Sequence, residues 1–141
     1  MENTENKNLC VQDSKQLARE AVKILLEKKG IDVKLYSVEG VTSVTDYYVN
    51  ATGRSQMHVG SLGEDVSDMM SAAGRSPLRI EGRQGNSWIL VDFGDVIVNV
   101  FDKASREFYD FDRLLPAEAL VNIDDLVSEV DEKMKINTAK E

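Results

Sequence analysis

The sequence predicts an α+β domain, in which a small mixed β-sheet carries helices mainly on one face. Segments with the apolar spacing of helices alternate with short runs of β-forming residues, in the order α-β-β-α-β-β-β-α. That order combines hairpins, which pair neighbouring strands antiparallel, with helical crossovers, which pair strands parallel. The chain has 141 residues, 42% of them hydrophobic, which is enough for one domain with its own core.

The chain divides into three segments. Residues 1–12 are polar and predict a flexible tail, residues 13–116 contain the predicted domain, and residues 117–141 predict a partly helical extension. The first residues lack the apolar stretch of a secretory signal and the arginine-rich character of a transit peptide, and no apolar run reaches about 18 residues. We therefore expect a cytoplasmic protein that does not enter a membrane.

The first half of the domain predicts two helices separated by two strands. Ser14 is a candidate N-cap for a helix that ends near Gly30. Residues 31–38 alternate between apolar and polar side chains, and residues 46–52 are rich in β-forming side chains, so both segments predict strands. An apolar stripe over residues 55–74 predicts the second helix.

The second half predicts three strands and two further helical segments. Residues 77–82 predict a short strand, and residues 87–91 and 96–101 predict two more strands on either side of the sequence DFGD. Residues 103–111 predict a short helix or turn. Apolar side chains at helical spacing over residues 116–141 predict a final amphipathic helix, followed by a polar tail.

The DFGD sequence predicts the turn of a β-hairpin. Gly94 accommodates the positive φ that a tight turn requires, and β-forming runs flank it. If Phe93 and Gly94 form a two-residue loop, Trp88 lies opposite Asn99, and cross-strand partners share one side. One side of the hairpin is then wholly apolar and is expected in the core: Ile89, Val91, Val96, Val98 and Val100.

The other side of this hairpin combines apolar side chains with an acidic rim. Its members are Trp88, Leu90, Ile97, Phe101, Asp92, Asp95 and Asn99. If helices cover only the apolar side, this patch faces solvent, as is typical of partner-binding surfaces. If another helix covers this face as well, Trp88 is an ordinary core residue. The residues alone leave both interpretations open.

The charge balance bears on the kind of partner. The chain has 25 acidic and 17 basic residues, which gives a net charge of -8. Affinity for a phosphate backbone comes from lysine and arginine displacing counterions, so an acidic surface opposes it. We expect basic protein partners and little direct contact with nucleic acid.

A nucleotide-binding enzyme is the alternative class. Asp92 and Asp95 are a candidate pair of metal ligands, and residues 51–55 precede a helix whose N-terminus suits an anion. No further carboxylate pattern accompanies them, and the lone His58 supports neither a catalytic triad nor a histidine-based zinc site. Cys10, the single cysteine, has no activating neighbour. We therefore expect no catalytic residues, no cofactor and no bound metal.

Three stretches together resemble the ribosomal silencing factors, also called the Iojap family. They are TDYYVNATGRSQMHV, IEGRQGNSWILVDFGDVIVNVFD and SREFYDFDRL, and the similarity runs from about Gln16 to Leu115. The ordered series of D-Y-Y, G-x-S-x-x-H, W-x-x-x-D-x-G-D-x-x-V and R-x-x-Y carries the resemblance.

The resemblance implies a nucleotidyltransferase-like fold without the catalytic carboxylates, and a non-enzymatic function. Family members bind the large ribosomal subunit through a protein at the intersubunit face, conventionally numbered fourteen. They block joining of the small subunit and repress translation when nutrients are scarce. They also tend to form homodimers when free. A role in assembly of the large subunit, rather than in silencing, stays open.

The resemblance also implies which residues contact the partner. Carried over by motif, these are Trp88, Leu90, Asp92, Gly94 and Asp95 of the hairpin, Asp46, Tyr47 and Tyr48 of the D-Y-Y motif, and His58 and Tyr109. Trp88 is the expected anchor and the aspartates the charged rim. The sequence departs from the family pattern at Asn99, where the family usually has a histidine, and asparagine cannot titrate.

Overall fold

The computed structural model describes residues 13–140, with side chains described as far as residue 136. The tail predicted for residues 1–12 lies outside the described residues. The elements in chain order are α1 (Ser14–Glu27), β1 (Ile31–Ser37), β2 (Tyr47–Gly53), α2 (Gln56–Ala72), β3 (Arg79–Glu81), β4 (Trp88–Asp92), β5 (Val96–Asp102), α3 (Lys103–Tyr109), the 3-10 turns η3 (Phe111–Leu114) and η4 (Ala117–Ala119), β6 (Leu120–Val121) and α4 (Asp124–Lys140).

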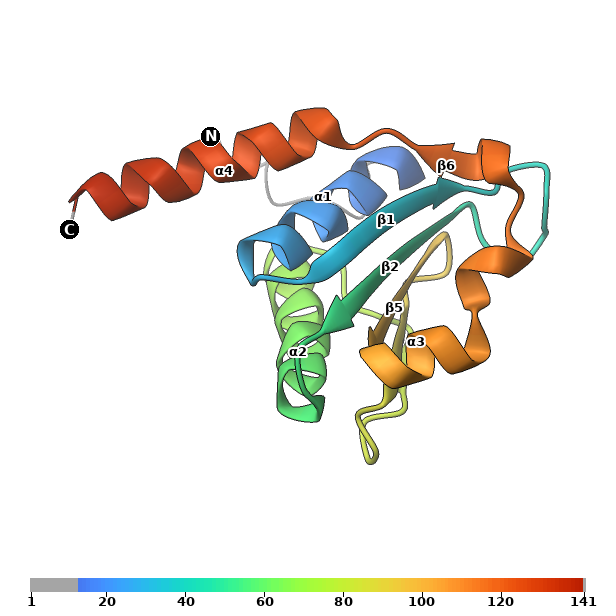
Figure 1. Ribbon diagram of the computed structural model, residues 1–141. Helices are drawn as coiled ribbons and strands as arrows, with labels where there is room; N and C mark the ends of the chain where they lie inside the picture. The colour runs from blue at the N-terminus through green and yellow to red at the C-terminus, as the bar shows by residue number, and fades with distance from the viewer. Residues whose placement is uncertain (1–12, 141) are drawn as a thin grey trace.

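The six strands form one mixed sheet in the order β3-β4-β5-β2-β1-β6. β2 and β5 at its centre are parallel, and the remaining neighbours are antiparallel. Helices α1 and α2 cover one face, while α3 and η3 lie against the other (Figure 1). The α+β fold predicted from the sequence is confirmed, because three of the four α-helices lie on the α1 side of the sheet and only the short α3 lies opposite.

The core lies between the sheet and α1–α2. β2 and β5 are the strands buried most completely, because helices or turns cover both of their faces. α1 contributes apolar side chains at helical spacing, among them Leu17, Ala21 and Leu25, and each is fully buried. Asp13 caps this helix, since its carboxylate accepts a hydrogen bond from the Gln16 amide at 3.0 Å. The expected cap at Ser14 was therefore one residue too late.

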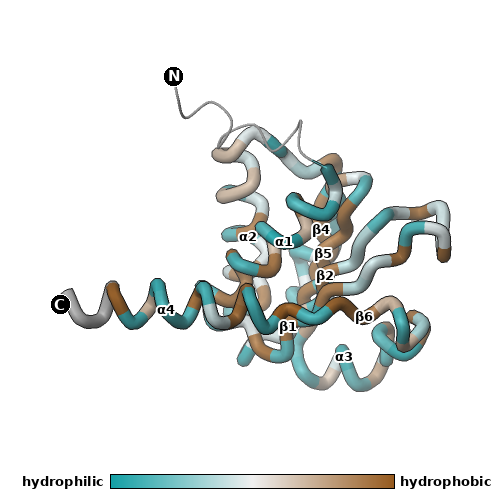
Figure 2. Tube along the Cα trace, turned by 90° about the horizontal axis from the view of Figure 1, so that it is seen from above, coloured by the Kyte–Doolittle hydropathy of each residue, from teal (hydrophilic) through white to brown (hydrophobic). Residues whose placement is uncertain are grey.

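The C-terminal segment, predicted as an amphipathic helix followed by a polar tail, contains a strand before its helix. Residues Leu120–Val121 form the edge strand β6, which pairs with β1, and the helix begins only at Asp124. Pro116 starts a 3-10 turn before β6, so the chain reaches the sheet edge before it turns into α4. Figure 2 shows hydrophilic and hydrophobic residues alternating along α4, which extends from the body toward the C-terminus.

Helix α4 packs along α1 in the same direction. Leu126 belongs to the core cluster, and Val130, one turn further along α4, is also buried. Three ion pairs follow the contact: Arg19 with Asp125 at 2.6 Å, Lys23 with Glu129 at 3.1 Å, and Glu27 with Lys133 at 2.8 Å. Because both partners advance by four residues from pair to pair, the helices are parallel. α4 therefore lies beside α1, on the side of the sheet opposite α3.

Candidate partner-binding surface

The β4–β5 hairpin is formed as predicted, but its register is shifted by two residues. Gly94 and Asp95 form the loop, and the Phe93 amide donates to the Val96 carbonyl at 2.9 Å. Trp88 consequently lies opposite Phe101 and not opposite Asn99. A shift of two preserves the alternation of sides, so the predicted core side is confirmed and its five apolar residues are buried.

Phe93 explains why the register differs. Its side chain is 1% exposed and lies in the core, on the same side as Ile89 and Val91. A loop at positions 93 and 94 would expose this ring to water. Gly94, at φ 95°, then supplies the left-handed backbone of the turn.

The second side of the hairpin is half covered. Ile97, Asn99 and Phe101 of β5 are at most 5% exposed, because the segment that contains α3 and η3 lies over them. Trp88 and Leu90 of β4 remain half exposed. The interpretation that this face is covered therefore holds for β5. The interpretation that it faces solvent holds in part for β4.

A cluster of aromatic rings forms where α3 and η3 meet β4. Trp88 lies with its ring centroid 4.9 Å from Phe101, 4.9 Å from Tyr109 and 6.1 Å from Phe111. Tyr48 meets Phe111 edge to face at 5.1 Å. We call these five residues the aromatic cluster. Its outer boundary is exposed, because Tyr109 is 52% exposed and the adjacent Phe108 is 80% exposed.

A shallow cleft of about 400 Å³ opens beside this cluster. It is lined by Glu81, Gly82, Ser87, Trp88, Leu90 and Tyr109. Half-exposed aromatic side chains that are fixed by packing and rimmed by polar groups are the features of a protein-binding anchor. Tyr109 was predicted from the R-x-x-Y motif, whereas Phe108 was not, since one exposed phenylalanine gives no signal in sequence.

A chain of buried hydrogen bonds fixes the orientation of Trp88. The Trp88 indole N–H donates to Asn99 Oδ1 at 3.0 Å, and Asn99 Nδ2 donates to Asn50 Oδ1 at 3.1 Å. Asn50 Nδ2 in turn donates to Asp112 Oδ1 at 2.8 Å. Asn99, the departure from the family pattern, therefore holds a polar link between neighbouring strands.

Asp112 ends this chain in an ion pair. Its Oδ2 accepts from Arg106 Nη2 at 2.7 Å and from the Tyr36 hydroxyl at 3.1 Å. Burial and the Asp112 charge raise the pKa of the Tyr36 hydroxyl, which therefore remains a donor. Arg106 also donates to Thr52 Oγ1 and to the Asp32 carbonyl, both at 2.9 Å. The network fastens the segment carrying Tyr109 and Phe111 onto the sheet, so it preorganises the aromatic cluster.

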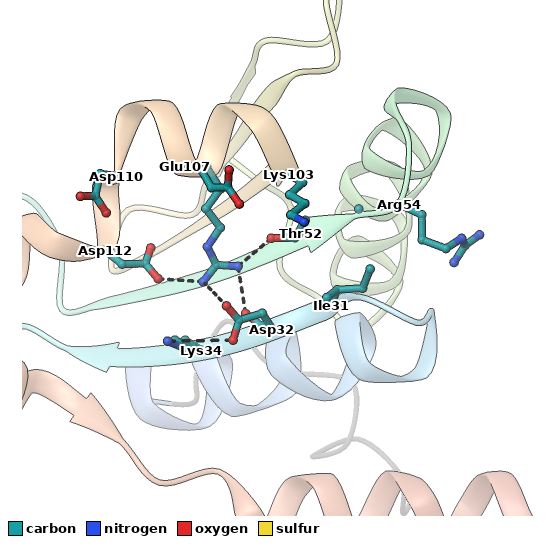
Figure 3. Close-up of a pocket in the computed structure, with 11 residues that line it drawn as sticks. Ile31, Asp32, Lys34, Thr52, Arg54, Lys103, Glu107, Asp110 and Asp112 are labelled. Carbon is teal, nitrogen blue, oxygen red and sulfur yellow. Dashed lines mark hydrogen bonds and ion pairs between the residues drawn. The ribbon is translucent and has the colours of Figure 1, made fainter.

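Arg106 also lines a second and larger cleft, beside β1. It has a volume of about 650 Å³ and lies between β1, β2 and α3. Lys103 and Arg54 lie at one end of it, and Asp110 and Asp112 at the other (Figure 3). Arg106 stands in the R-x-x-Y motif, which is the one sequence signal for this structural role.

The two aspartates of the DFGD turn are engaged within the chain. Asp92 Oδ2 accepts from Arg79 Nε at 3.1 Å, and its Oδ1 caps the Gly94 amide at 2.8 Å. Asp95 Oδ1 accepts from Arg75 Nη2 at 2.6 Å. The expected bare acidic rim is therefore largely neutralised. Among residues 13–140, no group of three His, Cys, Asp or Glu side chains is arranged to share a metal ion.

Two residues of the D-Y-Y motif do not reach the exposed surface of the aromatic cluster. Tyr47 is 7% exposed and points into the α1 side of the core, where burial raises the pKa of its hydroxyl. Asp46 lies at the other end of the sheet, where its amide donates to the Asp95 carbonyl at 3.0 Å. Only Tyr48, which points to the opposite face, belongs to the aromatic cluster.

His58 is also a structural residue. It is 8% exposed, its Nδ1 accepts from the Arg54 amide at 2.9 Å, and its Nε2 lies 3.0 Å from the Lys28 carbonyl. It therefore joins the end of α1 to the start of α2. The buried imidazole does not provide a surface for a partner.

The structure is an α+β domain with a half-exposed, preorganised aromatic cluster beside a shallow cleft. In comparisons with known proteins, the model of the family "Ribosomal silencing factor during starvation" matches residues 11–141. The chain is 31% identical to ribosomal silencing factor RsfS of Bacillus subtilis over 70% of this chain and 83% of that protein. It is 27% identical to the chloroplastic protein Iojap of Arabidopsis thaliana over 71% of this chain and 42% of that protein.

The fold is shared with a solved structure. A crystal structure of a protein from Chromobacterium violaceum superposes with a TM-score of 0.71 at 31% identity, covering 73% of this chain and 86% of that one. The chain belongs to the ribosomal silencing factor (RsfS/Iojap) family. Proteins of this family are non-enzymatic regulators that bind ribosomes. None of the helices described in this chain is long and apolar enough to cross a membrane.

Proposed function

We propose that this protein binds the large ribosomal subunit through the exposed side of the aromatic cluster and blocks joining of the small subunit. In this proposal the partner is the basic ribosomal protein numbered fourteen at the intersubunit face. Binding in the cytoplasm represses translation when nutrients are scarce. The observation that carries the proposal is the half-exposed Trp88 fixed between Tyr109 and the Asn99 hydrogen bond.

Preorganisation supports this choice of surface. Trp88 and Tyr109 pack on each other and on buried rings, so little side-chain entropy is lost when a partner covers them. Large rigid aromatic side chains of this kind dominate the binding free energy of many protein interfaces. Leu90 extends the same apolar surface along β4.

Charge supports a basic partner. The chain has a net charge of -8, and Glu81 lines the cleft beside Trp88. An acidic surface of this sign accelerates encounter with a basic protein and contributes to the choice of partner. Asp92, at the end of β4, is paired with Arg79, so it adds little net negative charge to this surface.

Direct binding measurements test the surface. Purified large subunits are pelleted through a cushion with the wild type, Tyr109→Ala or Phe108→Ala, and bound protein is quantified. Loss of one anchoring aromatic ring should cost about 2 kcal/mol, or a roughly 30-fold weaker Kd. Ile136→Ala is the matched control, because it removes an equally exposed apolar side chain on α4. Equal binding by all four proteins would place the interface elsewhere.

We also propose that the free protein forms a homodimer through the same aromatic surface. Exposed rings of this kind are covered in solution if two copies pack face to face. Dimerisation and ribosome binding then compete. Light scattering should detect a dimer that Tyr109→Ala weakens, and a dimer that stays intact on the subunit would contradict the competition.

A further inference from the structure

Cations gather at one edge of the sheet, at the end where the central strands β2 and β5 finish. These strands are parallel, and Gly53 pairs with Asp102, so both chains leave the sheet at the same edge. Arg54 follows β2 and Lys103 follows β5. Both line the same end of the larger cleft (Figure 3).

Two further segments bring cations to this edge. His58 contacts both the Lys28 carbonyl and the Arg54 amide, so the end of α1 lies beside the start of α2. The Asp102 amide donates to the Ser87 carbonyl at 2.9 Å, which fixes the turn before β4 at the same edge. The cations gathered there are Lys28, Lys29, Arg54, Arg83 and Lys103, all of them exposed, and we call them the basic edge.

The charges of the basic edge are not compensated within the described part of the chain. None of its five side chains makes an ion pair there, whereas most acids nearby are engaged. Asp32 pairs with Lys34 and Arg106, and Glu27 pairs with Lys133. Two neighbouring acids make no such pair within the same residues. Glu107 lies on the wall of the cleft, and Asp102 instead accepts a hydrogen bond from the Ser105 amide at 2.8 Å as the cap of α3.

The basic edge is continuous with the aromatic surface. Arg83 lies in the turn that leads directly into Trp88, and Lys103 begins the helix that ends at Tyr109. When a partner protein covers Trp88 and Tyr109, Arg83 and Lys103 therefore come close to the molecules that surround that partner. Exposed arginine and lysine with no internal partner suit phosphate groups, because binding releases the counterions of the phosphate backbone.

We propose that the basic edge binds the phosphate backbone of RNA next to the protein site on the large subunit. This inference rests on the proposed function. It revises the expectation of little nucleic-acid contact, which followed from the net charge of the whole chain. That net charge is a sum over the whole chain, and it does not describe the local charge at an edge where five exposed cations make no ion pair within the described residues.

The salt dependence of binding tests this proposal. Affinity for large subunits is measured for the wild type and for the double variant Arg54→Gln, Lys103→Gln over potassium chloride concentrations of about 50–200 mM. If both side chains contact phosphates, the slope of log K against log salt should fall by about 1.5, at roughly 0.7–0.9 per lost contact. The control Lys15→Gln, Lys135→Gln changes the charge equally at exposed positions on α1 and α4 and should keep the wild-type slope.

A second arm uses a fluorescent RNA hairpin and no ribosomal protein. At low salt the wild type and the Lys15→Gln, Lys135→Gln control should bind the hairpin equally, and the Arg54→Gln, Lys103→Gln protein should bind more weakly. An unchanged salt slope on subunits overturns the proposal. A reduced slope without hairpin binding also overturns it, because the edge then contacts an acidic protein.

The two proposals fail in distinguishable ways. If the wild type does not bind large subunits at all, the proposed function fails, and the hairpin measurement alone decides whether the edge binds RNA. If subunit binding depends on Trp88 but not on Arg54 and Lys103, the proposed function stands and the RNA contact does not.

Discussion

Asn99 shows how one residue determines the orientation of the proposed anchor. Its amide joins the Trp88 indole to Asn50 and is 1% exposed. Every buried polar side-chain atom of the described residues has a hydrogen-bond partner. Replacing Asn99 by an apolar residue leaves the Trp88 indole N–H and Asn50 Oδ1 without these hydrogen bonds.

We expect Asn99→Leu to lower the free energy of unfolding by about 1–3 kcal/mol, because Asn50 and the Trp88 indole N–H lose their partner in a buried site. Chemical denaturation measures this change. The fluorescence of Trp88, the single tryptophan, should shift as well. Gln84→Leu, in the exposed turn before β4, is the control. Equal stability of the two variants would show that the network contributes little.

The turn between β4 and β5 depends on the left-handed backbone of Gly94. Its φ is 95°, and an added Cβ would approach the Leu78 side chain at 3.2 Å. Gly94→Ala should destabilise the domain by about 1–2 kcal/mol because of the left-handed backbone. Gly85→Ala, in a neighbouring turn where an added Cβ meets nothing within 4 Å, should cost much less. Chemical denaturation measures the loss in free energy of unfolding for each variant. Equal losses in the two variants would contradict the role given to Gly94.

At the scale of elements, the sequence predicts what depends on local pattern. Alternation along β4 and β5 correctly divides the hairpin into a core side and a second side, and helical spacing locates α1 and α2. The register was wrong because burial of Phe93, a tertiary effect, overrides the local preference for a loop at 93–94. β6 was missed because two residues carry no periodicity, and the cover of α3 over β5 depends on contacts such as Asn50 with Asp112, far apart in sequence.

The contact between α4 and α1 gives a prediction for a whole element. Lys23→Glu replaces an attraction to Glu129 by repulsion, so α4 should separate from α1 more often. A solvent-screened pair of this kind is worth up to about 1 kcal/mol, so amide exchange in α4 should become about fivefold faster. Lys15→Glu, on the same helix and exposed, is the control. Restored protection in Lys23→Glu, Glu129→Lys would establish the pair, whereas unchanged exchange in Lys23→Glu would contradict it.

The pKa values of this contact predict how it responds to pH. Hydrogen bonding to Arg19 lowers the pKa of Asp125, so its contribution is present above its unfolded pKa and is lost as pH falls through the lowered value. Partial burial acts to lower the pKa of Lys23, but Glu129 and Glu20 outweigh it and raise the pKa. The Lys23 contribution is therefore lost only as pH rises through that raised value. The protection of the α4 amides from exchange should be greatest between the lowered pKa of Asp125 and the raised pKa of Lys23. It should decrease when the pH falls far enough to protonate Asp125.

At the scale of the whole molecule, the surface is polarised. The aromatic cluster lies on the α3 side of the sheet, and the basic edge lies at the end of the sheet where β2 and β5 finish, while α4 lies along α1 on the other side. A partner docked on the aromatic cluster leaves α4 outside the interface. The partner-binding residues implied by the family resemblance lie in different places: Trp88, Leu90 and Tyr109 line one cleft, whereas Tyr47 and His58 are buried for structural reasons. The role of the first three in binding stays a prediction.

If the aromatic cluster around Trp88 docks on the large subunit, the bound protein should block subunit joining, and sucrose-gradient sedimentation of purified subunits measures both effects. The wild type should travel with the large subunit and reduce the peak of joined ribosomes, whereas Trp88→Ala, with folding verified by circular dichroism, should restore that peak. Tyr109→Ala, which disturbs the core less, should act in the same direction. If the wild type stays at the top of the gradient, the protein does not bind the large subunit. If both variants prevent joining as well as the wild type does, the blocking surface does not lie on this cluster.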